Sequence, residues 1–116
     1  MKADPNLRAS STHRAAPPRS LARAAVLEQL RRFKEARGED FRVSRLGVFG
    51  SVARDEAGAE SDVDIVFETD EPNLFRTAHL RQELEEWLGC PVDIVRLRRT
   101  MNAALRERIL REARYV

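Results

Sequence analysis

The chain has 116 residues, of which 42% are hydrophobic and 34% are charged, a balance typical of one small globular domain. No apolar run approaches the roughly 20 residues that a membrane-spanning helix needs, so we expect no membrane association. The formal net charge is only +2, and the single cysteine, Cys90, excludes an internal disulfide framework or a cysteine-rich zinc site and favours a reducing, cytoplasmic location.

Basic residues gather at the two ends of the chain. Residues 1–19 are rich in Ala, Ser, Arg and Pro without a hydrophobic period, which predicts a flexible basic tail ahead of a domain over residues 20–116. The last 21 residues hold seven arginines against two glutamates. Such ends can contact nucleic acid or an acidic partner. We favour a tail and a solvated helix face, because no aromatic side chains alternate with these arginines.

The first predicted helix runs from Leu21 to about Arg37, with Ser20 as its N-cap and Gly38 as its stop. Its apolar stripe consists of Val26, Leu30 and Phe33, with Leu27 beside it. A strand over roughly Phe41–Phe49 follows and leads into a Gly50-Ser51 turn.

The middle of the chain predicts a short helix over Ser51–Glu56 and a second strand over Asp62–Glu68. Pro72 and Asn73 then open a helix that runs to Leu88 and is closed by Gly89. Four of its side chains are expected to face inward: Leu74, Leu80, Leu84 and Trp87.

The last part predicts a third strand over Pro91–Leu97 and a final helix capped by Thr100. One side of that helix carries Met101, Leu105, Ile109 and Ala113. The order α-β-α-β-α-β-α predicts an α/β (α+β) domain, a small mixed sheet flanked by helices.

Three acids stand out because each lies in a predicted apolar strand. Asp62 and Asp64 are two residues apart on one strand, so both side chains point to the same face. Asp93 lies inside the apolar strand Val92–Val95, where a charge is unusual. If the two strands are neighbours, three carboxylates converge, which is the ligand set of a site that binds two Mg²⁺ ions for phosphoryl transfer.

Each part of this pattern has a plainer explanation on its own. An isolated Asp-x-Asp is often the solvent-facing side of a half-buried strand, and Asp93 can be an exposed strand-end residue. Gly50-Ser51 can be an ordinary strand-to-helix turn, and Arg54 can pair with a neighbouring acid. The complete series is more specific: a strand, a Gly-Ser turn, ten residues, Asp-x-Asp in a strand, a helix, and a strand with a central Asp.

With these motifs the chain resembles the minimal nucleotidyltransferases of the polymerase-β-like superfamily. That family is marked by Gly-Ser, ten residues, Asp-x-Asp and a third Asp one strand later, here Gly50, Ser51, Asp62, Asp64 and Asp93. The segment Leu46–Arg54 is similar to the first family motif, and the end of the chain is similar to the closing helix of antitoxin-type members. The resemblance spans roughly residues 21–116 and implies the polymerase-β-like nucleotidyltransferase fold.

The resemblance also implies an activity, which is the transfer of AMP from ATP with release of pyrophosphate. Many such proteins are antitoxins whose partner is an all-helical HEPN-type ribonuclease toxin, silenced when a tyrosine near its active site receives AMP. In this chain Asp62 and Asp64 would hold the Mg²⁺ ions, and Asp93 would complete the site and accept the hydroxyl proton. Gly50 and Ser51 would anchor the nucleotide phosphates through backbone N–H groups, and Arg54, one turn on, could reach a phosphate oxygen.

Two other functions remain open from the sequence. The chain could be an antitoxin that neutralises its toxin by binding alone, or a nucleotidyltransferase that acts on RNA or a small molecule. The leading expectation is an enzyme that modifies a protein, because the domain is too short to enclose both ATP and a large acceptor.

Overall fold

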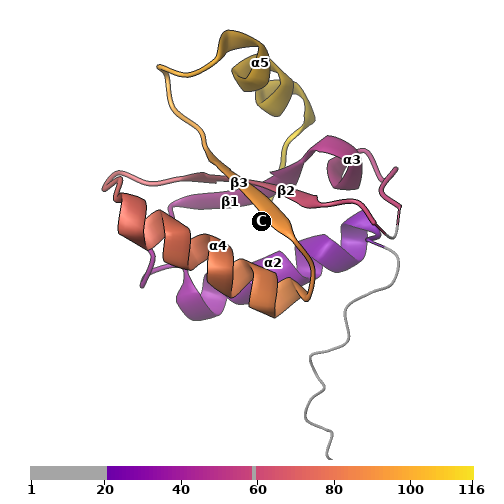
Figure 1. Cartoon of the computed structure of the whole chain (residues 1–116), viewed down its shortest axis with the longest axis horizontal. Coiled ribbons are helices and arrows are strands. Elements are labelled where there is room, and N and C mark those ends of the chain that lie inside the picture. Colours follow the sequence, from indigo (N-terminus) through magenta and orange to yellow (C-terminus); the bar gives the residue numbers. More distant parts are fainter. Residues whose placement is uncertain (1–20, 59) are drawn as a thin grey trace, which may run out of the picture.

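The computed structural model describes residues 21–58 and 60–116, which form eight helices and strands (Figure 1). The predicted tail over residues 1–19 and the predicted cap Ser20 lie outside the described residues. In chain order the elements are α2 (Arg23–Arg37), β1 (Arg45–Phe49), α3 (Gly50–Ala53), β2 (Val63–Glu68), α4 (Leu74–Leu88), β3 (Val92–Arg96), α5 (Ala103–Glu112) and β4 (Arg114–Tyr115). No helix of this described part is long and apolar enough to cross a bilayer.

The four strands form one mixed sheet in the order β3-β2-β1-β4. β1 pairs antiparallel with both β2 and β4, whereas β2 and β3 run parallel. The parallel pair follows from the chain path, because α4 carries the chain from the end of β2 back to the start of β3. The predicted α/β class with a small mixed sheet is therefore confirmed, with one additional strand.

The sheet has two differently covered faces. α2 and α4 lie under one face and α5 lies over the other (Figure 1). The larger core, between the sheet and the helices α2 and α4, includes Leu30, Phe33, Ile65, Leu80 and Leu84. A smaller cluster on the α5 face has Phe49, Val66 and Ile109 at its centre. The alternation along β2 places Val63, Ile65 and Phe67 in the larger core and Val66 in the smaller cluster.

The helix starts differ from the prediction at two places. α2 begins at Arg23 after Ala22, which supplies no side-chain cap. α5 is capped by Asn102 rather than Thr100: the Asn102 side-chain oxygen accepts a hydrogen bond of 2.9 Å from the backbone N–H of Leu105. Asn73 caps α4 in the same way, as predicted. Asn performs this role because its short side chain reaches the free N–H groups of the first turn.

The strand predicted from Phe41 begins only at Arg45. The preceding residues form turns in which Arg42 has a φ of 57°, a left-handed conformation that interrupts an extended strand. Phe41 is nevertheless buried, because its ring stacks on Phe33 with the ring centroids 6.2 Å apart. The predicted strand was therefore too long at its start, because Phe41 is an apolar, buried residue that lies in a turn.

Leu74 was predicted to face inward, but it is 88% exposed. The buried side of α4 carries Leu80, Leu84 and Leu88 at four-residue steps, and Leu74 lies on a different side of the helix. Trp87, also predicted to face inward, is 38% exposed, although its ring meets Phe33 edge-on and its indole N–H donates to the backbone carbonyl of Gln29 at 3.1 Å.

The strand β4 was absent from the prediction. It adds Arg114 and Tyr115 to the free edge of β1, and the N–H of Val116 donates to the carbonyl of Leu46 at 2.9 Å. The guanidinium of Arg45 lies 3.8 Å from the centre of the Tyr115 ring. Through this pairing, the end of α5 is attached beside β1.

Gly47 permits this pairing, and we expect Gly47→Ala to weaken it. A Cβ at this position would overlap the backbone carbonyl oxygen of Arg114, and backbone cannot move aside as a flexible side chain can. The substitution is expected to lower the free energy of unfolding by about 2 kcal/mol, as overpacking does elsewhere. Urea unfolding measures the loss, with Gly58→Ala as control, since no described atom lies within 4 Å of a Cβ at Gly58. Equal stability of both variants would contradict the tight approach of β4 to β1.

Candidate active site

The Gly50-Ser51 turn lies where β1 ends and the short helix α3 begins. Gly50 has a φ of 74°, a left-handed conformation that side-chain-bearing residues rarely adopt. A Cβ on Gly50 would also overlap Oδ2 of Asp64. Two independent requirements therefore favour glycine here, the backbone conformation and the close approach of the Asp64 carboxylate.

Asp64 is brought to the turn by the register of the sheet. It lies opposite Phe49 on the antiparallel neighbour β1 and beside Asp93 on the parallel neighbour β3. Its side chain is half-buried, while those of Asp93 and of Asp62 are exposed, and Asp62 immediately precedes β2. The sequence prediction that the Asp93 strand lies beside the Asp-x-Asp strand agrees with this register.

The carboxyl of Asp64 lies in surroundings that disfavour its charge. Burial raises its pKa above the ordinary value, and the negative charges of Asp93 and Asp62 raise it further. The guanidinium groups of Arg108 and Arg54 act in the opposite direction without cancelling the rise. A negative charge held at this cost is typical of a site that binds a cation or performs chemistry.

The three acids suit Mg²⁺ in their chemistry. Carboxylate oxygens are its preferred protein ligands, and this ion normally keeps water and phosphate oxygens in its remaining positions. Among residues 21–58 and 60–116, no three His, Cys, Asp or Glu side chains converge closely enough to hold a metal ion by themselves. The crowding of negative charge on Asp64 by Asp93 and Asp62 is what a cation would relieve. The three acids therefore suit Mg²⁺ in donor type, whereas the predicted convergence of three carboxylates on one spot is not found among these residues.

Glu112, at the end of α5, is the site residue that sequence reasoning missed. Its Oε1 accepts a hydrogen bond of 3.1 Å from the backbone N–H of Gly50. The same oxygen lies 3.1 Å from Nη1 of Arg54 and 3.4 Å from Nε of Arg108. Arg54 also pairs with Glu56, the neighbouring acid that the plainer explanation suggested. The carboxylate of Glu112 and a second arginine, Arg108, therefore lie at the turn beside Arg54.

The pairing of β4 with β1 explains how Glu112 reaches the turn. Val48 lies opposite Arg114 in this antiparallel pair. Gly50 comes two residues after Val48, just past the end of β1, and Glu112 comes two residues before Arg114. Glu112 could have been identified from the sequence only if β4 and its pairing with β1 had been predicted. No local sequence pattern marks β4, so this signal was missing.

Surrounding charges determine the ionisation of Glu112. Burial raises its pKa, but the Gly50 N–H and the guanidinium groups of Arg54 and Arg108 outweigh that effect, so the pKa lies below the ordinary 4.5. A pKa lowered by folding means that ionised Glu112 stabilises the fold above pH 4.5. This contribution is lost as the pH falls through the lower folded pKa.

We therefore expect Glu112→Gln to lower the stability modestly at pH 7, with a loss that shrinks as the pH falls below 4.5. The ion pairs with Arg54 and Arg108 are largely solvent-exposed on the arginine side, so the effect stays small. Thermal melting of both proteins between pH 3 and 8 measures the difference. A stability difference that grows in acid would contradict the ionised role of Glu112.

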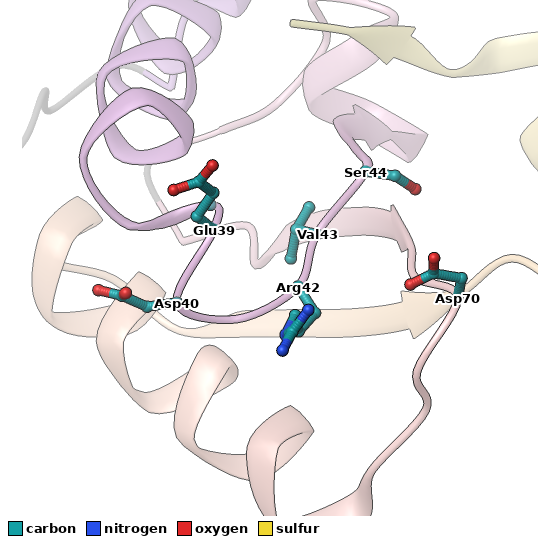
Figure 2. Close-up of a pocket in the computed structure, with 7 residues that line it drawn as sticks. Glu39, Asp40, Arg42, Val43, Ser44 and Asp70 are labelled. Carbon is teal, nitrogen blue, oxygen red and sulfur yellow. The ribbon is translucent and has the colours of Figure 1, made fainter.

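A surface hollow of about 590 Å³ lies elsewhere and is not part of this site (Figure 2). It is lined by Gly38, Glu39, Asp40, Arg42, Val43, Ser44 and Asp70. Ser44 precedes β1 and Asp70 follows β2, whereas Gly50 follows β1 and Asp64 lies near the start of β2. The hollow therefore belongs to the opposite end of the sheet.

Known proteins are similar to this chain in sequence and fold. The family model described as "Nucleotidyltransferase domain" matches residues 30–116. The chain is 42% identical over 84 residues to the protein adenylyltransferase MntA of Thermococcus cleftensis, which covers 72% of this chain and 83% of that protein. A solved structure described as a minimal nucleotidyltransferase is 42% identical, with a TM-score of 0.62 over 76% of this chain and 93% of that one.

A more distant likeness concerns the fold alone. A complex of a tri-AMPylated Shewanella oneidensis HEPN toxin with its MNT antitoxin contains a chain that is 20% identical. The TM-score is 0.53 over 84% of this chain and 71% of that one. The matched family model and the relatives of 42% identity lead to one assignment: the chain belongs to the nucleotidyltransferase domain family, in its minimal form.

Proposed function

We propose that the chain transfers AMP from ATP to a hydroxyl group of a partner protein and thereby acts as an antitoxin. The partner would be an all-helical HEPN-type toxin, and the acceptor a tyrosine. The observation that carries the proposal is Asp64 beside Asp93 in neighbouring strands, with Asp64 against the Gly50 turn. The similarity to a protein adenylyltransferase supports AMP as the transferred group.

The proposed chemistry is a displacement at the α-phosphorus. The acceptor oxygen forms a bond to this phosphorus, the bond from phosphorus to the bridging oxygen of the β-phosphate breaks, and pyrophosphate leaves. The exposed carboxylate of Asp93 is the candidate to take the hydroxyl proton, because it lies beside Asp64 yet is open to an acceptor.

The other residues would bind and orient the nucleotide. Asp62, Asp64 and Asp93 would hold Mg²⁺, which when bound lowers the pKa of the attacking hydroxyl and offsets the charge of the leaving pyrophosphate. Backbone N–H groups of Gly50 and Ser51, with the Ser51 hydroxyl, would hold the β- and γ-phosphates. Arg54 is exposed beside the turn and would contribute a positive charge. Positioning and charge stabilisation dominate such reactions.

A labelling experiment tests the proposal. The chain is incubated with Mg²⁺, its genetically neighbouring protein and ATP labelled either in the α- or in the γ-phosphate. We expect covalent label on the partner from α-labelled ATP only, since a kinase would transfer the γ-phosphate instead. Inhibition of the toxin without any label would support neutralisation by binding alone. Label on tRNA or a small molecule, with none on the partner, would support the third function.

A further inference from the structure

The carboxylate of Glu112 occupies a set of donors suited to phosphate. One oxygen of Glu112 receives the backbone N–H of Gly50 at 3.1 Å and lies 3.1 Å from Arg54 and 3.4 Å from Arg108. A backbone N–H flanked by two guanidinium groups is a combination that recognises phosphate oxygens strongly. Gly50 is also a residue proposed above to anchor the nucleotide, so Glu112 and a phosphate would require the same N–H.

The three side chains differ in their freedom to change partners. The Glu112 side chain is only 15% exposed, whereas those of Arg54 and Arg108 are 41% and 42% exposed. The arginines can therefore turn away from Glu112 toward a ligand in the solvent.

Arg108 also lies close to the turn. Its Nη2 is 3.2 Å from the position that a Cβ on Gly50 would take, and its guanidinium carbon is 5.5 Å from the centre of the Phe49 ring. Its charge also acts on Asp64, where it opposes the rise in pKa. Arg108 thus lies close to both the turn and the carboxylate of Asp64.

We propose that Glu112 is an internal competitor for the polyphosphate of the nucleotide, and that Arg108 joins Arg54 in binding that polyphosphate when Glu112 is displaced. The inference rests on the proposed function, because it concerns the same nucleotide site. ATP then binds at the expense of the Glu112 contacts, and the chain holds its nucleotide more weakly than its donor groups allow.

Calorimetric titration with Mg²⁺ and AMP-PNP tests the inference. Glu112→Gln removes the competing charge and is expected to tighten binding about five- to tenfold, as the loss of one charge-assisted contact predicts. Arg108→Gln is expected to weaken binding. The matched control is Glu107→Gln, which removes the same charge from an exposed position on the same helix and is expected to leave the affinity unchanged.

AMP provides a second ligand that separates competition from a general change in the site. AMP lacks the β- and γ-phosphates, so its affinity is expected to change little in Glu112→Gln. A structural effect of the substitution would instead alter both ligands in parallel, and that result would overturn the inference.

The remaining outcomes are equally decisive. Unchanged or weaker AMP-PNP binding in a folded Glu112→Gln variant overturns the inference, while transfer of AMP by the native chain keeps the proposed function. If the native chain binds no AMP-PNP with Mg²⁺, the proposed function fails and the inference with it. If melting shows that Glu112→Gln does not fold, Glu112→Asp replaces it, since the shorter side chain withdraws the charge from Gly50. Tighter AMP-PNP binding by Glu112→Asp supports the inference, and unchanged binding overturns it.

Discussion

Asp64→Asn is expected to reduce AMP transfer about a thousandfold or more, because the charged ligand for Mg²⁺ is lost at the centre of the site. The amide keeps the size and shape of the carboxylate but carries no charge. The fold should be retained and even gain stability, since burial and the neighbouring acids raise the pKa of Asp64 and so disfavour its ionised form. Transfer is measured as pyrophosphate release in the presence of the partner, and stability as thermal melting.

The control for this variant is Asp70→Asn, which removes a charge from an exposed residue beyond the other end of β2. It is expected to leave transfer unchanged. The double variant Asp62→Asn, Asp64→Asn is expected to be inactive as well. Full transfer by a folded Asp64→Asn protein would exclude this residue from the catalytic site and, with it, the assignment drawn from the Asp-x-Asp motif.

The parts of the site that the sequence predicts are those with a local pattern. Gly50-Ser51 follows an apolar strand directly, and Asp64 lies in a strand whose alternation is visible. The position of Asp93 beside Asp64 follows from a general rule, because a helix such as α4 between two strands most often leads to a parallel neighbour. The local sequence pattern and the chain topology together were sufficient to predict where these residues lie in the fold.

The parts that the sequence does not predict depend on contacts between distant segments. The strand β4 has two residues, Arg114 and Tyr115, and no alternation can be read from so short a segment. Its pairing with β1 brings Glu112 to Gly50, 62 positions away in the chain. The prediction that Leu74 faces inward was wrong for a different reason. One leucine at a helix start does not reveal which side of the helix is buried.

Gly50→Ala is expected to impair both the conformation of the turn and the site. An alanine at a φ of 74° costs about 1–2 kcal/mol in the free energy of unfolding. The added Cβ would also displace Oδ2 of Asp64 and crowd Arg108. Since the displaced atom is a proposed ligand of Mg²⁺, we expect transfer to fall at least about a hundredfold, as misplacement of a catalytic group by an ångström does elsewhere.

Comparison with two other glycines separates the causes of this loss. Gly58→Ala has open space around its Cβ in the described structure and is expected to keep both stability and transfer. Gly47→Ala is expected to lose stability through β4, because the atoms nearest to its Cβ belong to Arg114 and Tyr115. Gly47→Ala is destabilised to a similar extent but also loosens the β4 pairing that brings Glu112 to the turn. If Gly50→Ala lost no more transfer than Gly47→Ala, its loss would not be specific to Gly50. A larger loss in Gly50→Ala, measured on protein that is folded at the assay temperature, would mean that the turn must remain free of a side chain for Asp64 to occupy its working position.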